Sequence, residues 1–292
     1  MEKKIQVALI QFSPLSYDVK NNISKALILS KQALEQGAKI IVLPELFDSG
    51  YCVEDKDQKY ALSFKDLKHP TLKSLHNLAI RYKAYIIACS IEKDQNKLFD
   101  TAYILGTKGL IGKYRKIYLW GNEKKRFQKG NKYPVFKLKF PNFSIKLGLQ
   151  ICYEVGFGEG ARILALQGAQ IICYSAAFGK ARTYAWDLAS KARALENGVF
   201  VLASNRSGEE ISKIDGNKLE FAGHSRIINP KGEILATYEK EEGFIINEID
   251  IKEVEIQRNT IPYLKDLNLK LTQKNLKEIH LNTKERKWQK KF

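Results

Sequence analysis

Residues 147–160 read Leu147-Gly148-Leu149-Gln150-Ile151-Cys152-Tyr153-Glu154-Val155-Gly156-Phe157-Gly158-Glu159-Gly160. The apolar residues from 145 to 151 predict a buried strand, and a glycine-rich turn follows at Cys152. From about Phe157, apolar residues recur at helical spacing until Gly168. At such a strand-to-helix turn a cysteine is lifted clear of the sheet. There the following helix favours its thiolate, and backbone N–H groups can bind an oxyanion. We therefore predict that Cys152 is a nucleophile.

Strands and helices alternate in both directions from this stretch. The run 39–43 is continuously apolar and predicts a strand that is buried on both faces. No internal repeat or low-complexity linker interrupts the pattern, which predicts one α/β domain with helices outside and sheet inside. The expected strands are 5–12, 39–43, 84–90, 99–105, 110–114, 145–151, 169–174, 199–205, 221–229, 233–238 and 244–249, and the expected helices are 21–37, 71–82, 157–168 and 183–197.

The end of the chain differs in composition from the rest. Residues 266–292 are rich in lysine, and their leucines are irregularly spaced. This segment is too short to form its own core. We therefore expect a catalytic domain over 1–265, followed by a basic segment over 266–292 that is either a solvated tail or an arm at a subunit interface.

Composition excludes several classes of protein. With 44% hydrophobic residues, the 292-residue chain can bury a large core, but no apolar run approaches the length of a membrane span. The N-terminus moves straight into a strand, and the cysteines lack metal-ligand or redox spacing, which favours a reduced, cytoplasmic protein. The histidines never form close pairs, so a metal site is not expected. The four cysteines are Cys52, Cys89, Cys152 and Cys173.

Three chemically reactive side chains follow apolar runs. In α/β folds the loops after the strands collect the chemistry, and these positions hold Glu45, Lys116 and Cys152. Desolvation raises the pKa of a buried glutamate, which can then take the thiol proton and pass it to a leaving amine. A lysine can stabilise the oxyanion beside the N–H of Tyr153. Each of these charges could instead be an ordinary paired structural group.

These residues and their surroundings resemble the nitrilase superfamily of carbon–nitrogen hydrolases. The resemblance runs from about Ile5 to Asp266 in the family's order. Its segments are Leu43-Pro44-Glu45-Leu46-Phe47 with Gly50-Tyr51, Tyr114-Arg115-Lys116-Ile117-Tyr118-Leu119, Gly148-Leu149-Gln150-Ile151-Cys152-Tyr153-Glu154, Arg193-Ala194-Leu195-Glu196-Asn197, Ala203-Ser204-Asn205-Arg206, Gly223-His224-Ser225-Arg226-Ile227-Ile228-Asn229-Pro230-Lys231-Gly232 and Tyr263-Leu264-Lys265-Asp266.

The resemblance implies an αββα sandwich whose subunits pair into a four-layer homodimer or a higher homo-oligomer. It also implies that Glu45 is the general base, Lys116 the oxyanion stabiliser and Cys152 the nucleophile, and that Glu123 positions the lysine and the substrate. Neither a metal nor an organic cofactor is implied. The implied reaction is attack of the thiol on an amide carbon, loss of ammonia or an amine, and hydrolysis of the thioester.

One departure from the family's pattern bears on the substrate. Many members carry an arginine where this chain has Gly156, and that arginine can bind a substrate carboxylate. We therefore predict a neutral or cationic amide, with an N-carbamoyl compound or a nitrile as the alternative. Tyr153, where true nitrilases tend to have tryptophan, favours an amidase. The other residues that we expect beside the substrate are Tyr51, Ala176 and Ala177.

Two other functions are alternatives to a hydrolase. The glycines Gly156, Gly158 and Gly160 suggest a phosphate-binding loop, but their spacing differs from the dinucleotide fingerprint, and the next strand ends without a carboxylate. The net charge of +17 and the basic end suggest a nucleic-acid-binding protein. Because the lysines are spread over the whole chain, we prefer a solvated surface and expect no nucleic-acid partner.

Overall fold

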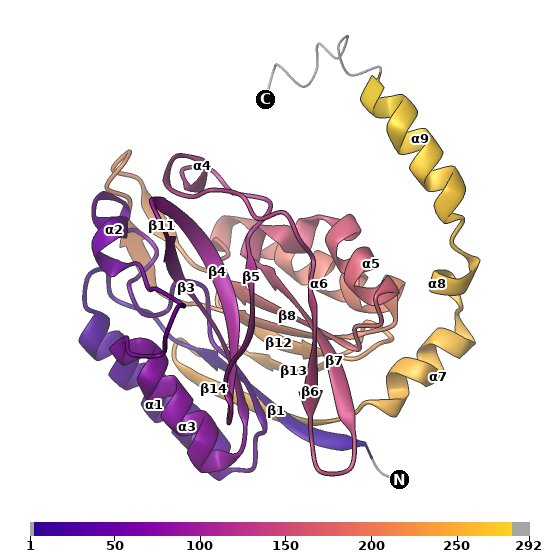
Figure 1. The fold of residues 1–292 in the computed structure, drawn as a ribbon, viewed down its shortest axis with the longest axis horizontal. Coiled ribbons are helices and arrows are strands. Elements are labelled where there is room, and N and C mark those ends of the chain that lie inside the picture. Colours follow the sequence, from indigo (N-terminus) through magenta and orange to yellow (C-terminus); the bar gives the residue numbers. More distant parts are fainter. Residues whose placement is uncertain (1–2, 282–292) are drawn as a thin grey trace.

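Two six-stranded sheets packed face to face make up the body of the protein in a computed structural model that describes residues 3–281 (Figure 1). Each sheet has three parallel strands at its centre and antiparallel strands outside them. The first sheet has the order β14 (Gly243–Asp250), β1 (Lys4–Gln11), β2 (Ile40–Val42), β3 (Tyr85–Asp94), β4 (Lys97–Gly106) and β5 (Gly109–Arg115). The second has the order β13 (Ile234–Tyr238), β12 (Ser225–Ile228), β9 (Phe200–Asn205), β8 (Ile171–Ala176), β7 (Ser144–Ile151) and β6 (Val135–Lys139).

The central strands are buried on both faces, as the run 39–43 predicts. In β2, Ile40 and Val42 belong to the core that joins the two sheets, whereas Ile41 belongs to the core beneath the first sheet's helices. Successive side chains of a strand point to opposite faces, so one apolar run fills two cores. This double burial explains why the strand reads as continuously apolar and not as alternating.

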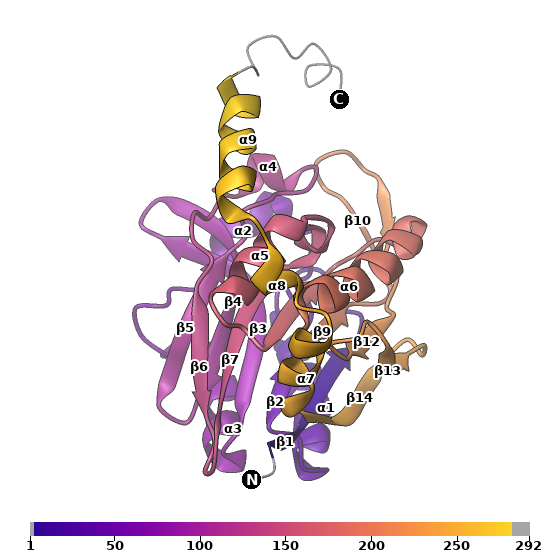
Figure 2. The same cartoon turned by 90° about the vertical axis from the view of Figure 1, so that its right-hand side faces the viewer.

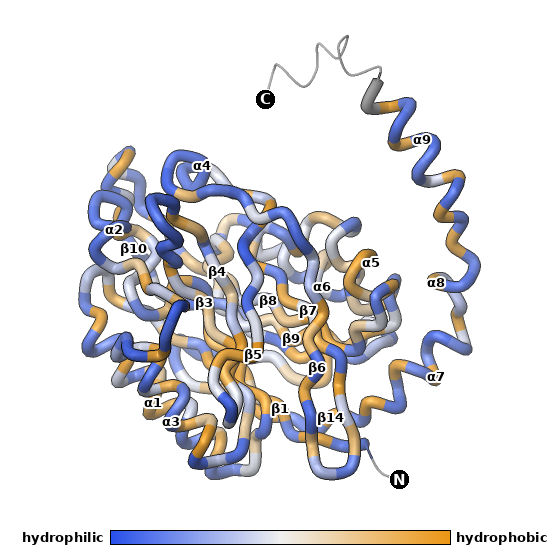
Figure 3. The backbone as a smooth tube through the Cα atoms, viewed as in Figure 1, coloured by the Kyte–Doolittle hydropathy of each residue, from blue (hydrophilic) through white to orange (hydrophobic). Residues whose placement is uncertain are grey.

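Helices cover the outer face of each sheet, with α1 and α3 on the first and α5 and α6 on the second (Figures 1 and 2). The strands between them are the most hydrophobic part of the chain (Figure 3). The expected αββα sandwich is therefore confirmed. The helices are α1 (Val19–Glu35), α2 (Asp57–Tyr60), α3 (Pro70–Tyr82), α4 (Glu123–Arg126), α5 (Gly158–Leu166), α6 (Thr183–Asn197), α7 (Lys252–Thr260), α8 (Tyr263–Asp266) and α9 (Leu269–Leu281), with short 3-10 helices η1 (Glu54–Lys56), η2 (Cys152–Gly156) and η3 (Lys180–Arg182).

The end of the chain returns to the first sheet and then leaves the body. Strand β14 pairs with β1, α7 and α8 follow, and α9 extends away from both sheets (Figures 1 and 2). The division into a domain over 1–265 and a basic segment over 266–292 stays a prediction, and residues 282–292 of that segment lie outside the described residues. Within 3–281, no helix is long and apolar enough to cross a membrane.

The structure differs from the sequence prediction in several elements. Helix α1 begins at Val19, not near Asn21, because the side chain of Asp18 accepts the N–H of Asn21 and caps the helix. The predicted strand 221–229 is shortened to β12, so that its first residues form a loop. The edge strand β6 and the small hairpin of β10 (Glu209–Ile211) and β11 (Lys218–Glu220) were not predicted, because their sequences are short and polar.

Candidate active site

Glu45 lies in the turn that follows β2 and is fully buried. Its backbone N–H donates to the carbonyl oxygen of Ala176 at 3.3 Å, and its Oε2 accepts the N–H of Ala177 at 2.8 Å. Both partners lie at the end of β8 in the other sheet. These bonds across the sandwich fix the carboxylate at the edge where the two sheets meet.

Lys116 follows β5 and is also fully buried. Its Nζ lies 2.6 Å from Oε1 of Glu45 and 2.8 Å from Oε1 of Glu123. A third carboxylate, that of Asp100 on β4, is 3.3 Å away. One buried ammonium thus lies among three buried carboxylates.

Glu123 begins α4 and connects the lysine to the aromatic wall of the site. Its Oε1 accepts the hydroxyl of Tyr51 at 2.5 Å, and its Oε2 accepts the N–H of Trp120 at 2.9 Å. Glu123 therefore holds Lys116, Tyr51 and the loop before α4 in one arrangement.

Cys152 stands at the end of β7 with a backbone φ of +47°. A side chain at positive φ is uncommon outside glycine and marks a sharp turn that aims the residue away from the sheet. The thiol is only 5% exposed and lies in the wall of a cavity of about 600 Å³. This is the strand-to-helix turn that the sequence predicts, with η2 inserted before α5.

Glu154 joins the segment of the lysine to that of the cysteine. Its Oε1 accepts the N–H of Ile117 at 2.8 Å, and its Oε2 accepts the N–H of Ile151 at 2.8 Å. Ile117 directly follows Lys116 in the chain, and Ile151 directly precedes Cys152. The carboxylate is fully buried, and burial raises its pKa to about 7 although hydrogen bonds act in the opposite direction. In the sequence Glu154 is only a motif position, and no local pattern predicts this connection.

Burial governs the ionisation of the reactive groups. It raises the pKa of the Cys152 thiol well above its usual value, and the carboxylate of Glu45 raises it further, against the opposing effect of Lys116. Burial also raises the pKa of Glu45 well above its usual value. Burial thus acts against the thiolate that is expected at this turn, and a buried thiol needs a base in order to react. For Lys116, burial alone would lower the pKa, but Glu123, Glu45 and Asp100 together raise it.

The three carboxylates of Glu45, Asp100 and Glu123 have oxygens within 4.8 Å of one another, a spacing at which acidic groups can hold a metal ion. The Nζ of Lys116 contacts all three. Because an ammonium already lies where these three carboxylates converge, the geometry favours an organic charge cluster over a metal centre.

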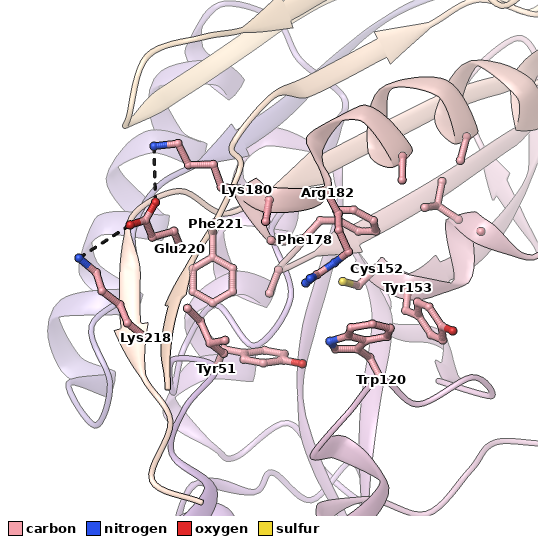
Figure 4. Close-up of a pocket in the computed structure, with 18 residues that line it drawn as sticks. Tyr51, Trp120, Cys152, Tyr153, Phe178, Lys180, Arg182, Lys218, Glu220 and Phe221 are labelled. Carbon is pink, nitrogen blue, oxygen red and sulfur yellow. Dashed lines mark ion pairs between the residues drawn. The ribbon is translucent and has the colours of Figure 1, made fainter. Parts of the chain in front are cut away.

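The cavity is mostly apolar and has charged groups at one side (Figure 4). Arg182 supplies a guanidinium to the wall of this cavity, and the carbon of that guanidinium lies 4.8 Å from the ring centre of Trp120. Glu220 is 3.6 Å from Lys180 and 3.9 Å from Lys218, so this carboxylate is already paired. Further apolar residues of the wall include Val155, Phe178, Leu219 and Phe221.

Four of the five predicted substrate-binding residues lie in the wall of this cavity. They are Tyr51, Tyr153, Gly156 and Ala177. Ala176 lies behind the wall, fully buried, where its carbonyl oxygen accepts the N–H groups of Glu45 and Arg206. Among the groups that the prediction misses, Asp100 has a detectable signal, because it is a lone carboxylate in an apolar run. Arg182 leaves no such signal in the sequence, because it lies outside the predicted strands and helices.

A buried carboxylate, ammonium and thiol at strand ends of two facing sheets define a cysteine hydrolase of the kind that cleaves carbon–nitrogen bonds. The chain matches the family model described as carbon-nitrogen hydrolase over residues 6–259. It is 38% identical to a nitrilase of Pyrococcus abyssi over 266 residues, which cover 90% of this chain and 95% of that protein. It is 32% identical to a human omega-amidase over 272 residues, covering 88% of this chain and 92% of that protein.

The chain belongs to the nitrilase superfamily of carbon–nitrogen hydrolases. Among solved structures, it is similar to a mutant amidase of Nesterenkonia sp. AN1 in which acrylamide has added to the active-site cysteine. The TM-score is 0.78 at 25% identity, and the match covers 92% of this chain and 99% of that chain.

Replacing Glu154 by glutamine tests its connecting role. An amide presents only one acceptor oxygen, so one of the backbone N–H groups now bonded to Glu154 would lose its partner. We expect Glu154→Gln to lower the free energy of unfolding by about 1–3 kcal/mol. We also expect kcat to fall about tenfold or more, because both reactive segments shift. Thermal unfolding and steady-state kinetics measure the two effects.

Glu159→Gln is the matched control, because Glu159 is exposed at the start of α5. It should leave both quantities nearly unchanged. Equal kinetics for wild type and Glu154→Gln would contradict the connecting role.

Proposed function

We propose that this protein is an amidase that hydrolyses the C–N bond of a small linear amide through a thioester on Cys152. The observation that carries the proposal is the contact of 2.6 Å between Lys116 Nζ and Glu45 Oε1, both fully buried and both in electrostatic interaction with Cys152 in the cavity wall. This arrangement supplies a base, a cation and a nucleophile in one dry site.

The reaction starts from the neutral thiol. As Sγ of Cys152 forms a bond to the amide carbon, its proton passes to the carboxylate of Glu45. The oxygen of the tetrahedral intermediate is stabilised by the Lys116 ammonium and the backbone N–H of Tyr153. Glu45 then returns the proton to the nitrogen, and the C–N bond breaks to release ammonia or an amine. Water, deprotonated by Glu45, hydrolyses the thioester and restores the thiol.

Glu123 and Tyr51 complete the proposed site. Glu123 holds Lys116 at 2.8 Å and is itself held by the Tyr51 hydroxyl. The lysine therefore needs no reorientation when negative charge forms on the substrate, which is the condition under which such a donor is most effective. A phosphate-binding loop at the glycine-rich turn would not explain why Glu45, Lys116 and Glu123 are buried together.

The charge of the cavity bears on the predicted preference for neutral or cationic amides. That preference rests on Gly156, where a side chain would meet no atom within 4 Å. The wall carries Lys180, Arg182 and Lys218 against the single carboxylate of Glu220. A cationic substrate would meet net positive charge there, so of the two options we propose the neutral one.

A second candidate substrate is an amide that carries a carboxylate, and the observation that favours it is Arg182. Its guanidinium stacks on Trp120, and within residues 3–281 no carboxylate forms an ion pair with it. A guanidinium that faces a cavity without an acidic partner can bind a carboxylate through two parallel hydrogen bonds. The human relative that is named an omega-amidase supports this candidate by analogy.

We also propose a homodimer, as the resemblance implies. The outer surface of α5 and α6 exposes large apolar side chains, with Tyr184 at 74% and Leu188 at 68%. Apolar groups that gather on neighbouring helices are typical of a surface that a second copy covers. The other exposed large apolar residues on α5 and α6 are Ile163, Leu166 and Leu195.

An ammonia-release screen over neutral amides, carboxylate-bearing amides, N-carbamoyl compounds and nitriles tests the reaction. We expect turnover of at least one amide, and a loss of about 1,000-fold or more in Cys152→Ala, because the thioester cannot form. Cys173→Ala is the matched control, since this buried cysteine lies on β8 away from the cavity wall. If Cys152→Ala matched the wild type on every active substrate, the proposed mechanism would be wrong.

Arg182→Gln distinguishes the two candidate substrates. If the guanidinium binds a carboxylate, kcat/KM for succinamate falls about tenfold or more, whereas kcat/KM for butyramide changes little. Lys180→Gln is the control, because Lys180 is already close to Glu220. An equal loss on both substrates would instead indicate that Arg182 acts through the packing of Trp120, and would remove the support for the second candidate.

Leu188→Glu tests the proposed dimer. Placing a carboxylate on the apolar surface of α6 should convert a dimer into a monomer in size-exclusion chromatography with light scattering. Ile28→Glu on α1 makes the same chemical change at a residue that is 55% exposed, and it should leave the mass unchanged. A wild-type monomer would refute the proposal directly.

A further inference from the structure

Asp100 is a fully buried carboxylate for which the mechanism above has no role. It lies on β4 between Phe99 and Thr101, in a strand that is otherwise almost entirely apolar or neutral. Burying a carboxylate is costly unless other groups compensate for the lost hydration. The neighbours of Asp100 therefore indicate what it does.

Two groups from neighbouring strands contact its carboxylate. Oδ1 accepts the S–H of Cys89, on β3, at 3.1 Å, and burial raises the pKa of this thiol so that it remains a donor. Oδ2 lies 3.3 Å from Lys116 Nζ without forming a regular hydrogen bond. The backbone of Asp100 also fixes the lysine, because its carbonyl oxygen accepts the N–H of Lys116 at 2.9 Å.

The charges at this point do not balance. Glu45, Asp100 and Glu123 have oxygens within 4.8 Å of one another, and Lys116 supplies a single positive charge. If all four groups were ionised, the net charge would be −2 in a site from which water is excluded. Repulsion of this kind favours the uptake of one proton.

We propose that Asp100 is a positioning residue whose negative charge makes Glu45 a stronger base toward the thiol of Cys152. This inference rests on the proposed function, in which Glu45 takes the proton. Burial is the largest cause that raises the pKa of Glu45, Lys116 opposes it, and Asp100 is the largest of the charges that raise it further.

The chemical reason is that the Cys152 thiol gives up its proton more readily to a carboxylate whose own pKa is raised. Burial raises the pKa of the Cys152 thiol, so an ordinary carboxylate would accept its proton only at a high cost in free energy. A carboxylate with a raised pKa accepts it more readily and later returns it to the leaving nitrogen. Glu123 raises the pKa of Glu45 in the same direction but less than Asp100, and its Oε1 is bonded to the Tyr51 hydroxyl and to Lys116.

Several titratable groups around Glu45 contribute to the pH dependence that we expect for the reaction of Cys152. They are Lys116 after β5, Glu123 on α4, Asp100 on β4 and Cys152 at the start of η2, with Cys89 behind Asp100 and Tyr51 behind Glu123. Of these, Asp100 is the carboxylate that can lose its charge while the hydrogen bonds from the lysine ammonium to Glu45 and Glu123 are kept.

The test is the pH profile for alkylation of Cys152 by iodoacetamide, followed by mass spectrometry of its peptide. In this reaction the S–C bond forms, iodide leaves and the thiol proton passes to Glu45, so the acid limb reports the basicity of Glu45. In Asp100→Asn we expect this limb to move to lower pH by about one unit or more, with a lower plateau rate. Asp94→Asn, the same change at a partly exposed carboxylate on β3, should leave the limb in place.

Asp100→Ser provides a second variant that removes the charge with a smaller side chain, and it should move the limb in the same direction. The inference is overturned if the limb stays or moves to higher pH in the variants. It is equally overturned if neither variant folds by circular dichroism, since Asp100 would then be only structural. Because alkylation needs no substrate, this outcome is separate from a failure of the amide screen.

Discussion

The ammonium of Lys116 is the constraint on which the site depends. It is fully buried and lies 2.6–3.3 Å from three carboxylates that come from three different segments of the chain. An unpaired charge at this depth would destabilise the fold by about 3–5 kcal/mol. The loops after β2 and β5 and the start of α4 are therefore held together by the same interaction that prepares the site for negative charge on a substrate.

Burial also explains why this site uses a carboxylate as its base. The same exclusion of water that raises the pKa of Cys152 raises that of Glu45, so this carboxylate accepts the thiol proton more readily than an exposed carboxylate would. A histidine is not needed. The aromatic and apolar wall around the thiol, from Tyr51 to Phe221, maintains this low-dielectric environment and also shapes the substrate cavity.

The sequence predicts the central strands and the reactive residues because both leave local signals. A strand buried on two faces reads as an apolar run, and a reactive group at its end interrupts that run, as Glu45 and Cys152 do. The roles of Glu45, Lys116, Glu123 and Cys152 remain predictions until they are measured. Their proximity is a structural observation.

Other features depend on contacts that no local pattern encodes. Arg182 reaches the cavity from η3 because that loop folds over Trp120, and the hairpin of β10 and β11 contributes its wall from a polar sequence. Gly156 is informative only by comparison with the arginine that many family members carry at this position. Substrate preference is therefore the least predictable property, since loops from distant segments determine it together.

The two sheets divide the site between two consecutive parts of the chain. The three carboxylates that contact the Lys116 ammonium come from residues before 130, whereas the thiol and the N–H of Ala177 come from the second sheet. Neither part contains a complete set of reacting groups. If these groups have the proposed roles, a nascent chain stays inert until its second sheet has been synthesised and has closed on the first, so that turnover would report the assembly of the whole sandwich.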